Sequence, residues 1–156
     1  MKNKVIIFAF AILITTLQSC FDNAIVDNFF TIPNQHWTYA QPIKTVVEIT
    51  NTTKNYNIFI NLRHTNAYKY ANIWFKVSII SPDKKKKTER VEFNLATTDG
   101  AWLGITAGDL FTCQLPYKQS FKFSQKGKYL IVVEQNMRDN PLDGVNDLGL
   151  RVETVK

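Results

Sequence analysis

The sequence predicts an all-β protein: a single antiparallel two-sheet β-sandwich that follows an N-terminal signal peptide. Three observations favour this fold. From residue 36 onward apolar residues recur at every second position, no stretch keeps a helical period, and turn residues separate the runs. Aromatic residues make up 13% of the chain, which is typical of β-rich domains. A closed barrel is the alternative arrangement of the same strands.

The N-terminus has the pattern of an export signal. Two lysines precede an uncharged apolar run of 13 residues, Val5–Leu17. This run is shorter than the ~20 residues that a membrane-spanning helix needs. Leu17-Gln18-Ser19-Cys20 follows and resembles the bacterial lipobox, although Gln18 departs from the usual second residue. We therefore predict a lipoprotein signal peptide over residues 1–19, cleavage between Ser19 and Cys20, and lipid on Cys20. The alternative is an ordinary secretory signal with a chance cysteine.

The rest of the chain divides into a tether and one domain. Residues 20–35 mix polar and apolar side chains around Pro33, so we expect a lipidated N-terminus and a spacer there. Residues 36–156 are expected to form the sandwich. Ile43–Thr50 and Tyr56–His64 alternate on either side of a five-residue turn and are expected to pair as a hairpin.

The later strands follow from the same alternation. Thr97–Gly108 contains three glycines and is expected to be irregular. Lys128–Arg138 is apolar on both faces at its middle and should be central in its sheet. Asp139–Asp147 is expected to be a long polar loop. The other expected strands are His36–Ala40, Tyr70–Ile80, Arg90–Ala96, Leu110–Leu115, Ser120–Ser124 and Leu148–Val155.

The chain shows no pattern of catalytic or cofactor chemistry. His36 and His64 lack metal-ligand spacing, and no glycine-rich loop joins a strand to a helix. Cys113 is expected to be a buried, inert thiol. The acidic residues of 139–147 lack the order of a calcium loop. We expect no enzyme, no metal and no cofactor. The net charge of +6 includes the Lys84–Lys87 run, which is expected to be a solvated turn and not a nucleic-acid site.

Arginines and a tryptophan stand where a plain sandwich does not need them. We take Arg63, Trp102, Arg138 and Arg151 as candidate partner-binding residues, since Arg and Trp often anchor interfaces. The alternative is that the arginines pair with nearby acids and the tryptophan fills core. Gln135–Arg151 is the expected main surface, with Arg138 and Arg151 flanking the acidic loop. Trp102→Ala is expected to harm partner binding more than folding.

Several segments together resemble one family. They are Arg63–Tyr68 with Tyr70–Trp74 (an R-H-x-x-x-Y-x-Y-x-N-I-W pattern), Gly100–Gly104 (G-x-W-L-G), Gly127–Tyr129 (G-x-Y), Gln135–Arg138 (Q-x-M-R), and then Leu142, Gly144, Asp147, Gly149 and Arg151. Their order and spacing resemble the GldH gliding-motility lipoproteins of Bacteroidota over roughly residues 25–155.

The resemblance implies a non-enzymatic outer-membrane lipoprotein of the gliding motility and type IX secretion machinery. Its implied partners are other gliding or secretion lipoproteins of the cell envelope, and the membrane itself through lipid on Cys20; nucleic acid is not expected. It implies no cofactor. The alternative function is a lipid-anchored envelope module that binds a carbohydrate or another ligand, which exposed aromatic side chains would suit.

Overall fold

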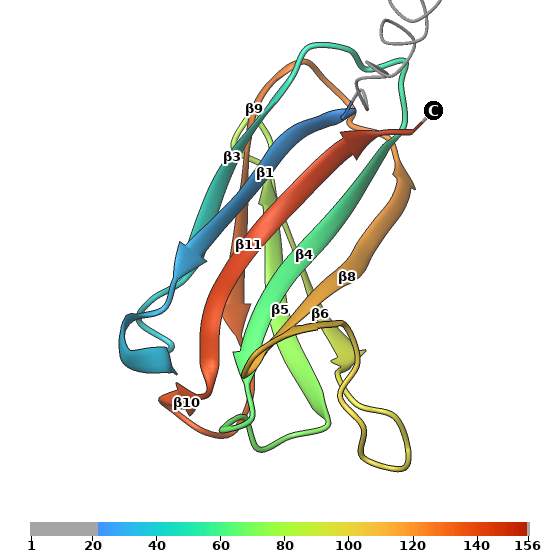
Figure 1. Ribbon diagram of the computed structural model, residues 1–156. Helices are drawn as coiled ribbons and strands as arrows, with labels where there is room; N and C mark the ends of the chain where they lie inside the picture. Colours follow the sequence, from blue (N-terminus) through green and yellow to red (C-terminus); the bar gives the residue numbers. More distant parts are fainter. Residues whose placement is uncertain (1–21, 156) are drawn as a thin grey trace, which may run out of the picture.

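The computed structural model describes residues 22–155 and confirms an all-β fold in which two antiparallel sheets pack as a sandwich (Figure 1). No helix in this part of the chain is long and apolar enough to cross a membrane. A single 3-10 turn, η1, covers Pro33–Gln35. The strands are β1 (Ala24–Thr31), β2 (His36–Trp37), β3 (Ile43–Ile49), β4 (Tyr56–Thr65), β5 (Asn72–Ile80), β6 (Lys86–Asn94), β7 (Ile105–Ala107), β8 (Leu110–Phe121), β9 (Gly127–Gln135), β10 (Leu142–Asp143) and β11 (Val145–Thr154).

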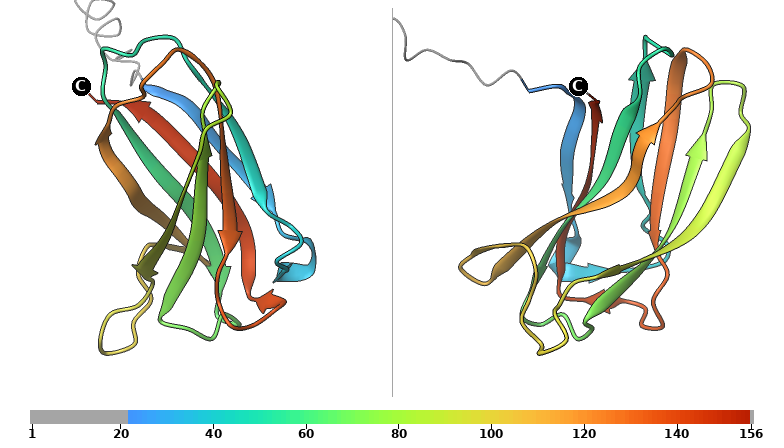
Figure 2. Two further views of the ribbon diagram at one scale, coloured as in Figure 1. Left: turned by 180° about the vertical axis from the view of Figure 1, so that it is seen from behind. Right: turned by 90° about the vertical axis from the view of Figure 1, so that its right-hand side faces the viewer.

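Two main sheets enclose the core. One has the strand order β1-β11-β4-β8-β7 and the other β3-β9-β5-β6, while β2 and β10 form a small separate pair (Figure 2). The sequence predicted alternating apolar residues on one side of each strand. In the structure these residues point into the space between the two sheets and contact each other there. Ile58, Ile60 and Leu62 of β4 are fully buried, as are Ile73 and Phe75 of β5. Strand β9 pairs with both β3 and β5, which confirms the expected central strand.

The expected hairpin between residues 43–50 and 56–64 is wrong. Strand β3 pairs with β9 in one sheet, whereas β4 pairs with β11 and β8 in the other. The turn over residues 51–55 therefore carries the chain from one layer to the other. Alternation marks which face of a strand is buried, and that face is the same whether the next strand lies beside it or opposite it. The alternation therefore predicts which residues of β3 and β4 are buried, but it does not predict which strands they pair with.

The tether assigned to residues 20–35 is also corrected for most of its length. Residues 24–31 form β1, an edge strand that pairs with β11 from Ala24↔Glu153 to Thr31↔Asp147. Its inward residues are mixed: Asn28 points toward the core, where its amide donates to Thr45 Oγ1 at 3.4 Å and its side-chain oxygen accepts from the Leu150 amide at 3.0 Å. A half-buried asparagine at an inward position breaks the apolar alternation that would have revealed the strand.

Two further segments differ from the expectation. The strands expected on either side of Pro116 are one continuous strand, β8, with register shifts where it meets β4. β7 pairs only with Leu110–Thr112, so among residues 22–155 Pro116 has a strand neighbour on one side only, where a proline is tolerated. The expected polar loop over residues 139–147 contains β10 and the start of β11, and Leu142, Val145 and Asp147 in it are buried.

Candidate partner-binding surface

Four loops gather at the end of the sandwich opposite residue 22, which we call the distal end (Figure 1). They are the segments around residues 32–42, 65–71, 95–104 and 136–144. Backbone hydrogen bonds tie them together: Gly144 N–H donates to Gln35 O at 3.0 Å, and Thr65 N–H donates to Gly144 O at 2.9 Å. Gly144 has a φ of +83°, and a Cβ there would lie 2.3 Å from the Tyr68 nitrogen. This close approach explains why glycine stands at that position.

The distal end carries a shallow depression of about 320 Å³, which we call the Trp74 depression. Its lining residues lie in or next to β5, in β6 and just after β9. It is lined by Tyr70, Asn72, Trp74, Arg90, Asn136, Met137 and Arg138. The Arg90 guanidinium lies 3.7 Å from the centroid of the Trp74 ring, and its Nε donates to Asn136 Oδ1 at 2.6 Å. Stacking and hydrogen bonding fix this arginine's orientation, which lowers the entropy that it would lose on binding a partner.

Gln135 holds the loop that forms one wall of this depression. Its side chain is 2% exposed. Its Nε2 donates to Asp139 O at 3.0 Å, and its Oε1 accepts from the Met137 amide at 2.9 Å. The Asn136 amide donates to Trp74 O at 2.8 Å, so the loop is fastened to β5 as well. Beside it, a hydrogen bond to the Asp139 carboxylate raises the pKa of Tyr70.

An aromatic cluster supports the distal end from within. The His64 ring is fully buried and lies 4.6 Å from the Trp102 ring, 5.3 Å from Phe111 and 5.5 Å from Tyr68, measured between centroids. Burial lowers the pKa of His64. Its Nδ1 lies 3.2 Å from Thr65 O, while Nε2 has no hydrogen-bond partner among the described residues. We interpret His64 as a neutral, structural imidazole that donates through Nδ1.

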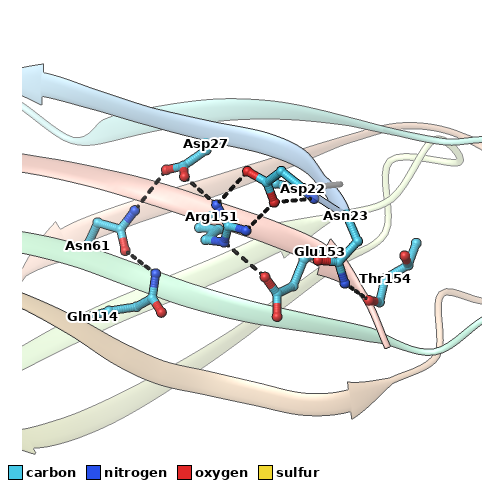
Figure 3. A network of polar contacts seen from close by, with 9 residues as sticks. Asp22, Asn23, Asp27, Asn61, Gln114, Arg151, Glu153 and Thr154 are labelled. Carbon is cyan, nitrogen blue, oxygen red and sulfur yellow. Dashed lines mark hydrogen bonds and ion pairs between the residues drawn. The ribbon is translucent and has the colours of Figure 1, made fainter. Parts of the chain in front are cut away.

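Of the four candidate residues, Arg63 and Arg151 are engaged within the fold. Arg63 stacks on Phe29 at 4.0 Å and lies 3.7 Å from the Asp147 carboxylate. Arg151 contacts three carboxylates, those of Asp22, Asp27 and Glu153 (Figure 3). The network continues across the sheet through Asn61, which donates to Asp27 Oδ1 at 3.1 Å. None of the three acids that Arg151 contacts belongs to the loop that it was expected to flank.

The other two candidates, Trp102 and Arg138, lie at the distal end. Trp102 is half-buried against His64 and Phe111, and its indole N–H donates to Asn66 Oδ1 at 3.1 Å. Arg138 is exposed and forms no ion pair with another residue in the 22–155 range. Arg151 sits in the second half of β11 within its ion-pair network, away from Arg138 at the distal end, so the two arginines do not lie side by side.

Sequence reasoning missed Arg90. The signal was present, because Trp74 alternates with the inward residues Ile73 and Phe75 and must therefore face outward on its sheet. An outward tryptophan needs a neighbour to cover it, and the pairing of β5 with β6 brings Arg90 beside it. The Trp74–Arg90 contact thus depends on a register that the sequence did not reveal.

Within residues 22–155 no group of three or more His, Cys, Asp or Glu side chains is placed to hold a metal ion. Asp143 contacts His36 at 2.6 Å and Asp147 accepts from Thr31 at 2.8 Å, so the acids of this segment point to different partners. Cys113 is buried, and burial raises the pKa of its thiol. Ser19 and Cys20, the expected cleavage and lipidation site, lie outside the described residues.

Comparison with known proteins gives one consistent result. The model of the family described as GldH lipoprotein matches residues 24–152. The chain is 31% identical over 160 residues to the gliding motility lipoprotein GldH homolog of Christiangramia forsetii, covering 98% of both chains. It is also 31% identical to the gliding motility lipoprotein GldH of Flavobacterium johnsoniae, covering 97% of this chain and 96% of the relative. No solved structure matches the chain.

Proposed function

The chain belongs to the GldH lipoprotein family, and from this premise we propose that it is a non-enzymatic outer-membrane component of the gliding motility and type IX secretion machinery. The observation that carries the proposal is the extent of the match. Residues 24–152 begin with the first residue of β1 and end inside β11, so the similarity spans the whole sandwich and not one loop of it.

We place the partner-binding surface at the distal end. The family-like segments around Tyr70–Trp74 and Gln135–Arg138 are 60 residues apart in sequence and form the two walls of the Trp74 depression. Arg90 is already oriented there by Trp74, and Arg138 is exposed with its charge free for a partner carboxylate. The proposed partners are other lipoproteins of the gliding or secretion apparatus.

A carbohydrate-binding module is less well supported. Such a module would suit open aromatic faces, but Trp37 is fully buried, Trp102 is packed among aromatic rings and Arg90 covers Trp74. The matched relatives are named as gliding motility lipoproteins and not as enzymes, which supports a non-enzymatic role.

The anchor is proposed at Cys20, and it is tested by mass spectrometry of the native protein and of a Cys20→Ala variant. We expect native protein that begins at Cys20 and carries lipid, and a variant that keeps its signal peptide and carries no lipid. A mature N-terminus elsewhere, or an unmodified Cys20, would refute the anchor.

The partner surface is tested by crosslinking in intact envelopes followed by a pull-down. Arg138→Gln removes the exposed cation just beyond β9, and Lys128→Gln removes an exposed cation at the other end of the same strand. We expect Arg138→Gln to reduce the crosslinked partner and colony spreading, with protein level and Tm unchanged, while Lys128→Gln behaves as wild type. Equal crosslinking by the two variants would exclude this surface.

A further inference from the structure

Lysines gather around a second concavity at the end of the sandwich where the described chain begins. This basic groove has a volume of about 630 Å³ and lies between β8 and the β5–β6 hairpin. It is lined by Ile79, Ser81, Lys85, Lys86, Lys87, Glu89, Tyr117, Lys118, Phe121, Lys122, Phe123, Ser124 and Tyr129. The cluster unites the last three lysines of the 84–87 run with Lys118 and Lys122. The run was expected to be a solvated turn, but Lys86 and Lys87 begin β6.

The rim of the groove has an excess of positive charge. Its one acid, Glu89, accepts from Lys118 at 2.5 Å and from the Tyr117 hydroxyl at 3.4 Å, so it is already neutralised. Lys86, Lys87 and Lys122 are exposed and have no ion-pair partner among residues 22–155. The groove therefore favours an anionic occupant.

The floor of the groove is apolar and rigid. The Phe121 and Phe123 rings lie 4.9 Å apart edge to face, and the Phe123 and Tyr129 rings lie 4.7 Å apart. Tyr117 is half-buried beside them, and burial raises the pKa of its hydroxyl. A cationic rim above an aromatic floor matches a molecule with an anionic head and an apolar part, since each half meets its complement.

The register of the sheet places this groove near the start of β1. Ala24 pairs with Glu153, Glu153 pairs with Asn57, and the neighbouring Tyr56 pairs with Phe121 of the groove. Asn57 also accepts from the Ser120 amide at 3.0 Å. Three strand spacings, roughly 14 Å, therefore separate the first residue of β1 from the groove. Figures 1 and 2 show the start of β1 and the end of β8, which contributes Phe121 to the groove, at the same end of the molecule.

We propose that the basic groove binds an anionic phospholipid of the membrane that holds the chain. The proposal rests on the proposed function for its geometry, because lipid on Cys20 lies only two residues before Asp22 and would bring this end to the membrane surface. The apolar floor favours a phospholipid over a free phosphate ion. The position beside the anchor favours it over an acidic protein segment, for which the distal end is the more accessible site.

The test measures binding to the full chain, purified in a mild non-ionic detergent, by isothermal titration calorimetry. The probes are dihexanoyl phosphatidylglycerol below its critical micelle concentration, dihexanoyl phosphatidylcholine, inorganic phosphate and a hexaglutamate peptide. We expect saturable binding of phosphatidylglycerol that weakens as salt rises, and little binding of the other three. Comparable binding of phosphatidylcholine or phosphate would overturn the proposal, as would preferred binding of the peptide or no binding at all.

A pair of charge-matched variants assigns the site. Lys86→Gln with Lys122→Gln removes two rim lysines, whereas Lys44→Gln with Lys69→Gln removes two exposed lysines elsewhere. Because each lysine near an anionic lipid surface contributes roughly a fivefold change, we expect the first pair to weaken phosphatidylglycerol binding by about tenfold or more. The second pair should leave it unchanged. Equal losses in both pairs would indicate non-specific charge attraction and would refute the groove.

The two proposals fail in distinguishable ways. If the anchor is present and partners crosslink but phosphatidylglycerol does not bind, only the groove is refuted. If phosphatidylglycerol binds at the groove but motility and secretion are normal without the protein, the lipid-binding proposal is supported and the proposed role in gliding and secretion is refuted.

Discussion

Arg151 shows how a single residue can be placed by partners that are remote in sequence. Its guanidinium lies 2.9 Å from Glu153 within β11 and contacts Asp22 and Asp27, which precede it by more than 120 residues. Its hydrogen bonds hold the pKa of Asp22 below its usual range. The arginine side chain is 16% exposed although the aspartates are largely solvated. We therefore assign Arg151 to fastening β1 onto the sheet.

We predict that Arg151→Lys lowers the Tm by about 4 °C, because a lysine ammonium cannot reach three carboxylates in the fork geometry of a guanidinium. This replaces the sequence-based hypothesis that Arg151 contacts a partner with the alternative that it pairs with acids of the fold. Arg138→Lys is the matched control, since that side chain is exposed and unpaired within the described chain. Thermal melts followed by circular dichroism measure both; an unchanged Tm for Arg151→Lys would contradict the fastening role.

The sequence motifs identified some residues of the Trp74 depression, but they did not separate residues of the candidate site from residues that stabilise the fold. The resemblance named Trp74, Met137 and Arg138, and all three line one depression. It also named Arg151, which the fold uses elsewhere. A motif residue and a structural residue look alike in one sequence, because ion pairs across β1 and β11 depend on register that no local pattern contains.

At the scale of elements, alternation located most strands and left their neighbours undetermined. Strands β3 and β4 follow each other in sequence with a short turn, which favours a hairpin, yet they lie in opposite sheets. Strand β1 escaped detection because polar Asn28 takes an inward position and the strand lies at an edge. Its attachment depends instead on Gly149 of β11.

We predict that Gly149→Ala detaches β1 or unfolds the domain. A Cβ at Gly149 would lie 1.7 Å from the Asn28 carbonyl oxygen and 2.9 Å from Phe29 Cα, both of them backbone atoms that cannot rotate away. Hydrogen exchange of the β1 and β11 amides measures the effect, and we expect protection to be lost there first. Gly100→Ala provides the comparison, because a Cβ there meets no atom within 4 Å and only its φ of +88° is unfavourable. Wild-type protection in Gly149→Ala would contradict the close packing of the two strands.

The loop after β6 is held against the sandwich by the packing of Trp102. Trp102 packs against His64 and Phe111, and Gly104 next to it is enclosed so tightly that a Cβ would lie 2.4 Å from Thr112 O. We therefore expect Trp102→Ala to destabilise the fold by about 2 kcal/mol, less than a fully buried tryptophan would cost. Trp74→Ala is the matched comparison and should change stability less, because its ring lies on the outer face of its sheet. Urea titrations of both compare the free energies of unfolding; equal values would contradict the assignment.

At the scale of the whole molecule, the fold separates two surfaces. The basic groove lies at the end where β1 begins and β8 ends, and the Trp74 depression lies at the other end, where β5 begins. Figure 1 shows these strand ends at opposite ends of the sandwich. Strand β4 runs between the ends with 10 residues, so the two surfaces stand roughly 30 Å apart. A rigid sandwich of this length would hold a partner-binding surface at a fixed height above a membrane. The sequence predicted the sandwich, but the opposition of the two ends depends on strand order.

The last prediction concerns how that height is fixed. Lipid on Cys20 and the basic groove are both proposed to hold the end of the sandwich opposite the distal end at the membrane. If both do so, a longer link between Phe21 and Asp22 should have little effect on partner binding while the groove still binds phospholipid. A ten-residue Gly/Ser insertion adds a flexible reach of about 17 Å, enough to let the domain tilt or rise once the groove is released.

We expect the insertion alone, and Lys86→Gln with Lys122→Gln alone, to reduce partner crosslinking mildly. Together they should abolish most of it, with protein level and lipidation unchanged. Crosslinking in intact envelopes measures all three variants, and a two-residue insertion serves as the length control. A combined effect no greater than the sum of the separate ones would show that the groove does not help to set the height of the distal end.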